Sequence, residues 1–263
     1  MLLRPYAFSV AEEADQSVDG FNLVQYEEGG EKKWQLNGKS AEVEGEKVKI
    51  NEISALAFGE GTTLKLKANK GSFNRENGLV HLNENVIIKT TDRTTIETDS
   101  LNWDANTRNV STDEPVNMKR AEFEVKGNGA EIDLENKKAE LKNDITANIA
   151  SPETGILGAG EGPKNRTTEI TCEGPLELNY KKNRAAFLNN VEIKDKEGNI
   201  FADRVDVYFN PSTRRIKCVV ARGNVRIVNG ENITYSEKAI YLVDEGRVVL
   251  PNRPKLVINT ESQ

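Results

Sequence analysis

The sequence predicts an all-β protein built from repeated antiparallel strand pairs, and three observations lead to this prediction. Similar segments recur about every thirty residues. Asn, Asp, Gly and Pro gather in short stretches between them, and within each segment apolar residues alternate with polar ones. Because each strand pair then has one apolar face, the pairs must stack these faces together, which predicts a sandwich-like or folded-over roll.

The repeat is marked by an apolar anchor residue that follows a short polar or Gly/Pro stop. The anchors are Ile53, Val86, Val116, Ile145, Val191, Val225 and Leu256. The differences between successive anchor numbers are 33, 30, 29, 46, 34 and 31. Residues 79–88, 185–193 and 219–227 share one pattern around their anchors, which predicts a strand, a polar kink and a second strand in each repeat.

The connections between strands have the composition of hairpin turns. Candidate turns lie at 74–78, 104–108, 135–138, 210–213 and 244–246. Asn, Asp, Gly and Pro adopt or enforce the φ values that such turns need. Residues 131–134, 176–180 and 204–209 alternate between these turns, so each is predicted to be a strand with one apolar and one solvated face.

One anchor spacing is longer than the others, and its extra residues lie in the Gly- and Pro-rich stretch 150–163. This stretch breaks the alternation and predicts either a boundary or a long surface loop within one domain. The predicted organisation is a tail or trimmed export segment at 1–19, a roll at 20–150, a linker or loop at 151–166 and a roll at 167–263. The two rolls stand in tandem or form one continuous roll.

Composition argues against several classes of function. The 36 basic and 42 acidic residues are interspersed and give a net charge of −6, without a Lys/Arg block that would bind nucleic acid. One histidine, His81, and two cysteines, Cys172 and Cys218, rule out most zinc, haem and Cys/His nucleophile schemes, so neither a cofactor nor a metal is expected. The cysteines form either a disulfide in an oxidising compartment or two buried thiols.

The sequence also lacks the motifs of common enzymes and of membrane-spanning proteins. Neither a Walker-type phosphate loop nor Gly-x-Ser-x-Gly occurs, and the acidic pairs show no partner nucleophile, so no catalytic residue is predicted. No run of about 18 apolar residues exists, so the chain as given does not span a bilayer. Residues 1–10 are too short and interrupted for a complete signal peptide, and we expect a trimmed export segment or a mature end with an added Met1.

Several segments, in order, are similar to a known family. The first group consists of residues 34–36, 39–42, a strand that runs to Ile53, and residues 66–71, 68–86, 98–104, 113–116 and 127–130. It resembles an LptC-type domain of the lipopolysaccharide export machinery. The second group runs from Cys172 through 190–191, 201–203 and 223–225 to Leu256 and resembles the related OstA/LptA-type domain. The resemblance covers about residues 20–260.

The resemblance implies a β-jellyroll open along one side, whose apolar inner face shields lipid acyl chains. It implies a non-enzymatic periplasmic protein that stacks end to end with others into a bridge from the inner to the outer membrane. The expected partners are lipopolysaccharide or lipid A, other bridge or inner-membrane transporter components joined by β-strand addition, and further copies of the chain. The chain joins both domain types and lacks the usual N-terminal membrane helix, so any inner-membrane anchor is expected outside this sequence.

Two other functions remain open. One is a structural or adhesive β-roll that binds proteins through its strand edges and keeps a filled interior. The other, ranked last, is a carbohydrate-acting enzyme, which would need paired carboxylates in one cleft.

The candidate lipid-binding residues are the inward positions of strands that alternate clearly, and each of them could instead be packed core. They are Leu64, Leu66, Phe73, Leu82, Val86, Ile88, Ile96, Leu101, Trp103, Val116, Met118, Leu176, Leu178, Leu188, Val191, Ile193, Val205, Val207, Phe209, Val225 and Ile227. For Trp34 and Trp103 we favour a role as large core side chains over a role in contacting lipid. His81 falls on the opposite, polar face.

Overall fold

The computed structural model describes residues 16–26, 29–59, 62–91, 93–104, 106–107, 109–120, 123–151, 166–196, 198–213 and 215–258. In these residues the all-β prediction is confirmed, because the strands form one 17-stranded sheet with a short 3₁₀ turn, η1 (Val243–Glu245). The strands are β1 (Gln16–Tyr26), β2 (Lys32–Glu44), β3 (Lys47–Gly59), β4 (Thr62–Asn74), β5 (Leu79–Thr90), β6 (Thr94–Asp104), β7 (Asn109–Arg120), β8 (Phe123–Asp133), β9 (Lys138–Ser151), β10 (Arg166–Cys172), β11 (Leu176–Asn179), β12 (Arg184–Asp195), β13 (Gly198–Phe209), β14 (Ile216–Asn229), β15 (Asn232–Leu242), β16 (Arg247–Val249) and β17 (Lys255–Val257).

The sheet follows the order of the chain, and all its pairs are antiparallel. Each strand from β1 to β8 pairs with the next. The long strand β9 then pairs with both short strands β10 and β11, which also pair with β12. From β12 to β15 the order is sequential again, and β15 carries β16 and β17. The sheet therefore continues past the Gly- and Pro-rich stretch, of which 152–165 lies outside the described residues.

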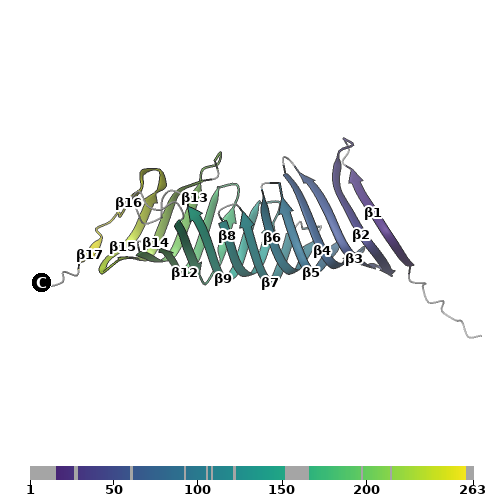
Figure 1. Ribbon diagram of the computed structural model, residues 1–263, viewed down its shortest axis with the longest axis horizontal. Coiled ribbons are helices and arrows are strands. Elements are labelled where there is room, and N and C mark those ends of the chain that lie inside the picture. Colours follow the sequence, from purple (N-terminus) through teal and green to yellow (C-terminus); the bar gives the residue numbers. More distant parts are fainter. Residues whose placement is uncertain are drawn as a thin grey trace, which may run out of the picture.

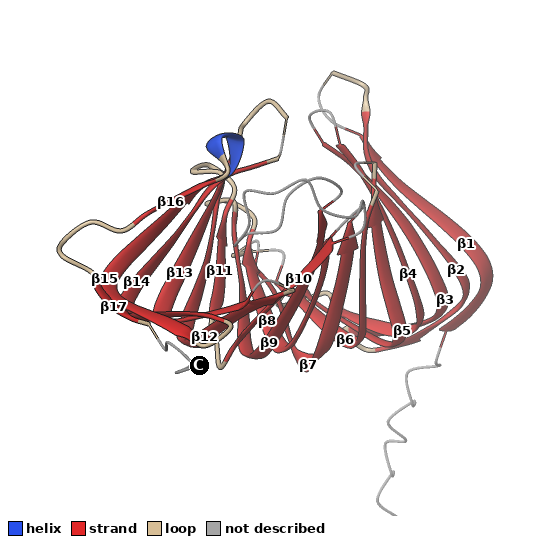
Figure 2. Cartoon of the chain, turned by 60° about the vertical axis from the view of Figure 1, so that its left-hand side comes forward, coloured by secondary structure: helices blue, strands red, loops and turns tan. Residues whose placement is uncertain are grey.

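The polar stops before the anchors are bends inside long strands. The residue before each of Ile53, Val86, Ile145, Val191 and Val225 has a positive φ. The sheet register shifts between residues 83 and 86, 188 and 191, and 222 and 225, which is the signature of a β-bulge. Bulges bend a strand and increase its twist. The predicted kinks are thus present. The strands bend in the same sense along the length of the molecule, so the sheet is folded over on itself (Figure 2).

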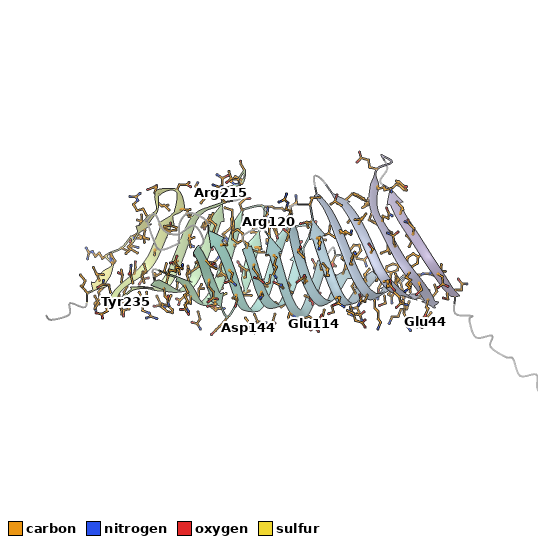
Figure 3. All side chains as sticks on the ribbon, in the orientation of Figure 1. Glu44, Glu114, Arg120, Asp144, Arg215 and Tyr235 are labelled. Carbon is orange, nitrogen blue, oxygen red and sulfur yellow. The ribbon has the colours of Figure 1, made fainter. Side chains whose placement is uncertain are left out.

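In the middle of the roll, folding at the bends brings strand ends from both edges to one side of the molecule, whereas Glu44, near the β1 end, lies on the side of the bends (Figure 3). We call the ends near Thr94, Phe123 and Gly198 the first lip, and those near Asn109, Arg184 and Ile216 the second lip. Arg120, on the first lip, and Arg215, on the second, lie on the same side in Figure 3. Glu114 and Asp144, at the bends, lie on the opposite side. The molecule is an elongated roll whose strands cross its long axis in two layers (Figure 1).

Small residues face the anchors at the inside of the bend. Val116 pairs with Gly127 and Val191 with Ala202 on the neighbouring strand. The anchors are almost inaccessible to solvent, since Val191 is 1% exposed. A branched side chain opposite a small one fills a narrow corner without a clash. Leu256 differs from the other anchors, because it lies in the short outer strand β17 and is 57% exposed.

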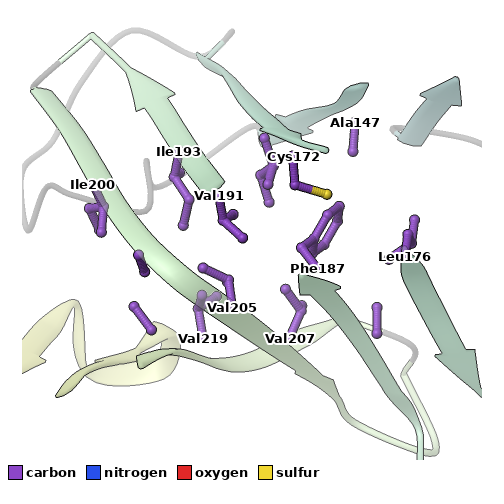
Figure 4. Close-up of a cluster of buried hydrophobic side chains, with 14 of the residues drawn as sticks. Ala147, Cys172, Leu176, Phe187, Val191, Ile193, Ile200, Val205, Val207 and Val219 are labelled. Carbon is purple, nitrogen blue, oxygen red and sulfur yellow. The ribbon is translucent and has the colours of Figure 1, made fainter. Parts of the chain in front are cut away.

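The buried side chains form two clusters along the roll. The first cluster lies in β2–β6 and contains Ala41, Ile50, Ile53, Ala68, Leu82, Val86, Ile88 and Leu101. The second cluster takes side chains from β8 through β15, so the last strands before the Gly- and Pro-rich stretch share a core with the strands after it. Figure 4 shows part of the second cluster, with Ile193, Val205 and Val219 pointing into one interior.

Candidate functional site: the apolar inner face

The inner face carries two unbroken rows of apolar residues that run along most of the roll. In each row every residue is the direct cross-strand partner of the next. The first row, between the bend and the first lip, is Leu23, Leu36, Ala55, Leu66, Ile88, Ile96, Met118, Val125, Ala147, Ile170, Ile193, Ile200 and Ile227. Cross-strand pairs are the unit of sheet stabilisation, and here they also form a continuous apolar track.

The second row lies between the bend and the second lip. Its members are Val43, Val48, Phe73, Val80, Trp103, Val110, Ile132, Ala139, Leu178, Ala185, Val207, Val219, Tyr241 and Val248. Because the sheet is folded at the bends, members of both rows enter the same core, as Ile193 and Val207 do in the second cluster. The two rows line opposite walls of one apolar interior.

The two parts of this interior differ in how completely they are filled. Ile170, Ile193 and Val205 in the second cluster are 0% exposed. In the first cluster Val86 alone among its buried members is less than 2% exposed, and the surrounding row residues, such as Leu66 and Val80, are only half-buried. The inner face over β2–β6 therefore keeps accessible apolar surface, whereas that over β9–β14 is packed against itself.

Most of the predicted lining residues lie on the inner face. Leu66, Ile88, Ile96, Met118, Ile193 and Ile227 belong to the first row, and Phe73, Trp103, Leu178 and Val207 to the second. Leu82, Val86, Leu101, Val116, Leu176, Val191, Val205 and Val225 lie at or beside the bend. Leu64 and Phe209 lie at the lips. Trp103, at a strand end, is 38% exposed.

The inward assignment of Leu188 is wrong. Leu188 pairs with Arg204 on the outer face, and the inward position belongs to Phe187, which is buried in the second cluster. Leu188 stands three positions before the inward anchor Val191, whereas alternation places inward residues an even number of positions away. Between them β12 carries a bulge of one extra residue, with Asn189 and Asn190 both at positive φ. Counting back four residues from the anchor, as from Val86 to Leu82, would have identified Phe187.

Sequence alternation also missed one contact that joins the two lips. Phe123, the first residue of β8, and Phe209, the last of β13, pack edge to face with ring centroids 6.2 Å apart and planes at 65°. Their strands are separated in the sheet by β9 to β12, so the rings meet across the interior. No local pattern predicts such a contact, since it depends on how the folded layers cross.

The outer face of the second part holds a buried carboxylate. Asp206 is 0% exposed and accepts hydrogen bonds from Arg204, at 3.0 Å, and from Arg222. The bond to Asp206 raises the pKa of Arg204 above its ordinary value. Arg184 lies 3.7 Å from Asp206 and donates to Glu177 at 3.3 Å. A buried carboxylate needs such partners, so this network stabilises the sheet and resembles no catalytic pair.

His81 and the cysteines offer no reactive centre. His81 is exposed on the outer face, with Nδ1 2.7 Å from Asn102 Oδ1. The cysteines are free thiols, which settles the alternative left open by their spacing. Cys172 lies in the second cluster, whereas Cys218 pairs with Tyr208 on the opposite face. Burial raises the pKa of both thiols.

The described strands and turns contain no group of three or more His, Cys, Asp and Glu residues placed to hold a metal ion. Nor does the described part contain a helix long and apolar enough to cross a membrane.

The two ends of the sheet differ. At one end β1 pairs along its length with β2 and has no described strand on its other side. At the other end β15 is covered by β16 and β17, each pairing over three residues. Pro251 and Pro254 separate these short strands, and proline cannot donate a hydrogen bond to an added strand.

Comparison with known families gives two matches in this chain. Residues 9–150, more than half of the chain, match the family described as lipopolysaccharide-assembly, LptC-related. Residues 174–262 match the family described as LptA/(LptD N-terminal domain) LPS transport protein. A search of curated proteins found no match.

Proposed function

The chain belongs to the LptC-related lipopolysaccharide-assembly family, and from this premise we propose that it is a periplasmic bridge component that binds the acyl chains of lipopolysaccharide on its inner face. The observation that carries the proposal is the pair of continuous apolar rows. A track of cross-strand apolar neighbours gives an acyl chain similar surroundings at every strand, so the lipid can move without a specific site.

The hydrophobic effect alone can drive such binding. Each Å² of acyl surface removed from water contributes about 25 cal/mol, and the half-buried residues over β2–β6 supply the receiving surface. The polar and charged outer face stays in water. The proposed role is therefore transport, with neither a catalytic residue nor a cofactor.

The proposed organisation keeps two family units in one sheet. The LptC-like unit occupies about 20–150 and the OstA/LptA-like unit about 167–263. Val125, Leu141 and Ile149 of the first unit pack in the second cluster, so the two units share a core.

The proposed protein partners are other bridge or transporter components that add a strand to the sheet. The free edge of β1 supports this role best, because it offers unpaired backbone groups over the longest stretch. The short strands and prolines at the other end disfavour the same pairing there. End-to-end association of copies would use the same edge.

A purely structural β-roll is the second candidate, and the filled second cluster favours it for that part of the molecule. The two candidates differ at the half-buried inner residues, which only a lipid carrier exposes to acyl chains.

The test is site-specific photo-crosslinking in cells that make lipopolysaccharide. A photoreactive amino acid replaces Leu66 or Ile88 on the inner face, or Lys65 or Lys89 on the outer face as matched controls. Each control is the sequence neighbour of an inner site, and Lys65 pairs directly with Lys89. Lipopolysaccharide adducts at the inner sites but not at the lysines are expected. A folded protein without adducts at either inner site would leave the structural roll as the function.

A further inference from the structure

The contact between Phe123 and Phe209 divides the interior at one place. The two rings come from opposite lips, and their centroids are 6.2 Å apart. Both pack against the second cluster, together with Met118 and Leu178. Within the described residues, no corresponding aromatic pair joins the lips over the first cluster. The Phe123–Phe209 contact therefore joins the two lips at β8, where the second cluster begins.

Packing on the two sides of this contact is different. Beyond it, residues of both rows, such as Ile193 and Val207, are at most 2% exposed, because they are covered by other side chains of the second cluster. Before it, Leu36, Leu66 and Ile96 of the first row are half-buried, with apolar surface still accessible. The inner face over β2–β6 thus offers apolar surface that an acyl chain can contact.

We propose that Phe123 and Phe209 set the internal limit of the lipid-binding face. Acyl chains bind over β2–β6, and they reach the face over β12–β14 only when the two rings separate. This inference rests on the proposed lipid-binding function and specifies where on the inner face binding occurs. An edge-to-face pair suits this role, because rotation of either ring about its side-chain torsions breaks the contact without breaking a backbone hydrogen bond.

The experiment maps where a lipid probe binds. Purified full chain is mixed with a long-chain fatty acid that carries a photoreactive diazirine, irradiated, digested and examined by mass spectrometry. In the native chain, adducts are expected on peptides of β2–β6, with background labelling on β12–β14. In the F123A/F209A variant, labelling of β12–β14 is expected to rise about two- to tenfold, the range that corresponds to the loss of one aromatic pair.

The control is F201A, which removes an aromatic ring from the outer face of β13, where Arg226 lies 3.9 Å above it. F201A is expected to keep the native labelling pattern. If F123A/F209A does not fold, by circular dichroism, F209L replaces it, since leucine retains apolar contact without the ring edge.

Equal labelling of β2–β6 and β12–β14 in the native chain would overturn the inference even if no variant folded. So would a folded F123A/F209A or F209L variant that labels β12–β14 no more than F201A does. If the proposed lipid-binding function itself is wrong, the result differs: neither β2–β6 nor β12–β14 is labelled.

Discussion

At the scale of single residues, the shape of the roll depends on small side chains at the inside of its bends. Gly71 in β4 lies opposite Leu82, and its φ is not in the left-handed region, so space and not backbone freedom requires glycine here. A Cβ atom at this position would lie 2.5 Å from Ile53 Cδ1 and 2.8 Å from Leu82 Cδ2. Both neighbours belong to the first cluster and would have to shift to make room for this Cβ.

We expect Gly71→Ala to lower the free energy of unfolding by about 1–3 kcal/mol, the usual cost of overpacking a core. Urea unfolding followed by circular dichroism measures the change. Gly29→Ala is the matched control, because a Cβ there meets nothing within 4 Å, and its midpoint should stay near that of the native chain. Equal midpoints for the two variants would contradict the role of Gly71.

The cysteines give a second prediction at this scale. Because Cys172 and Cys218 are free and face opposite sides of the sheet, unreduced protein unfolded in denaturant should take up alkylating reagent at both thiols. In the folded protein Cys172 should react much more slowly than Cys218, because Cys172 is buried and Cys218 is only half-buried. Burial raises its pKa, so the reactive thiolate is scarce at neutral pH and increases only as the pH rises toward that pKa. Mass spectrometry of the alkylated peptides measures both rates, and an unreduced chain that takes up no reagent would disprove the free thiols.

At the scale of the strand, the bend is made by backbone conformation. In β5, Glu84 and Asn85 have φ of 63° and 58°, and β12 repeats this with Asn189 and Asn190. Left-handed backbone is unfavourable for most residues, and asparagine and glycine tolerate it best. The polar residues before Val86 and Val191 are therefore needed for the backbone conformation of the bulge, beyond their exposure to water.

Asn85→Val should destabilise the chain by about 1–2 kcal/mol, because a β-branched residue is strained at positive φ. Asn85→Gly should be neutral or slightly stabilising, since glycine adopts this conformation freely. Chemical unfolding midpoints of the two variants test this. Asn148→Val, in β9 and without a positive φ, is the control and should change little. A similar loss in all three variants would argue against the backbone explanation.

Sequence patterns predicted the elements of this fold well, because its strands, turns and bends are local. The turns at 74–78, 135–138 and 210–213 lie between the strands that were expected on either side. Two features escaped prediction for physical reasons. The Phe123–Phe209 contact and the burial of Asp206 on the outer face depend on tertiary packing.

At the scale of the molecule, neighbouring repeats support one another, and burial deepens along the chain. The edge strand β1 has exposed Val18 and Leu23, whereas β10, β12 and β13 carry side chains without exposed surface. In repeat-like structures, stability is roughly a sum of local and nearest-neighbour terms, so regions with different burial open independently.

Hydrogen exchange should therefore be uneven. We expect amides in β10, β12 and β13 to exchange most slowly, those in β4–β6 at intermediate rates and those in β1 fastest. Mass spectrometry of peptides, with the unfolded chain as reference, measures the order. Uniform protection from β1 to β14 would show instead that the roll unfolds as one cooperative unit.

The continuity of the sheet has a mechanical consequence. Strands lie across the long axis of the molecule, so their ladders of hydrogen bonds point along it (Figure 1). A pull on the two ends loads these ladders in series, and the molecule bears no more tension than its weakest ladder. Pairing between β6 and β7 is interrupted between residues 97 and 102. A stretched chain should therefore separate first at the three-residue ladders of β16 and β17, and among β1–β9 the β6–β7 ladder should separate before its neighbours.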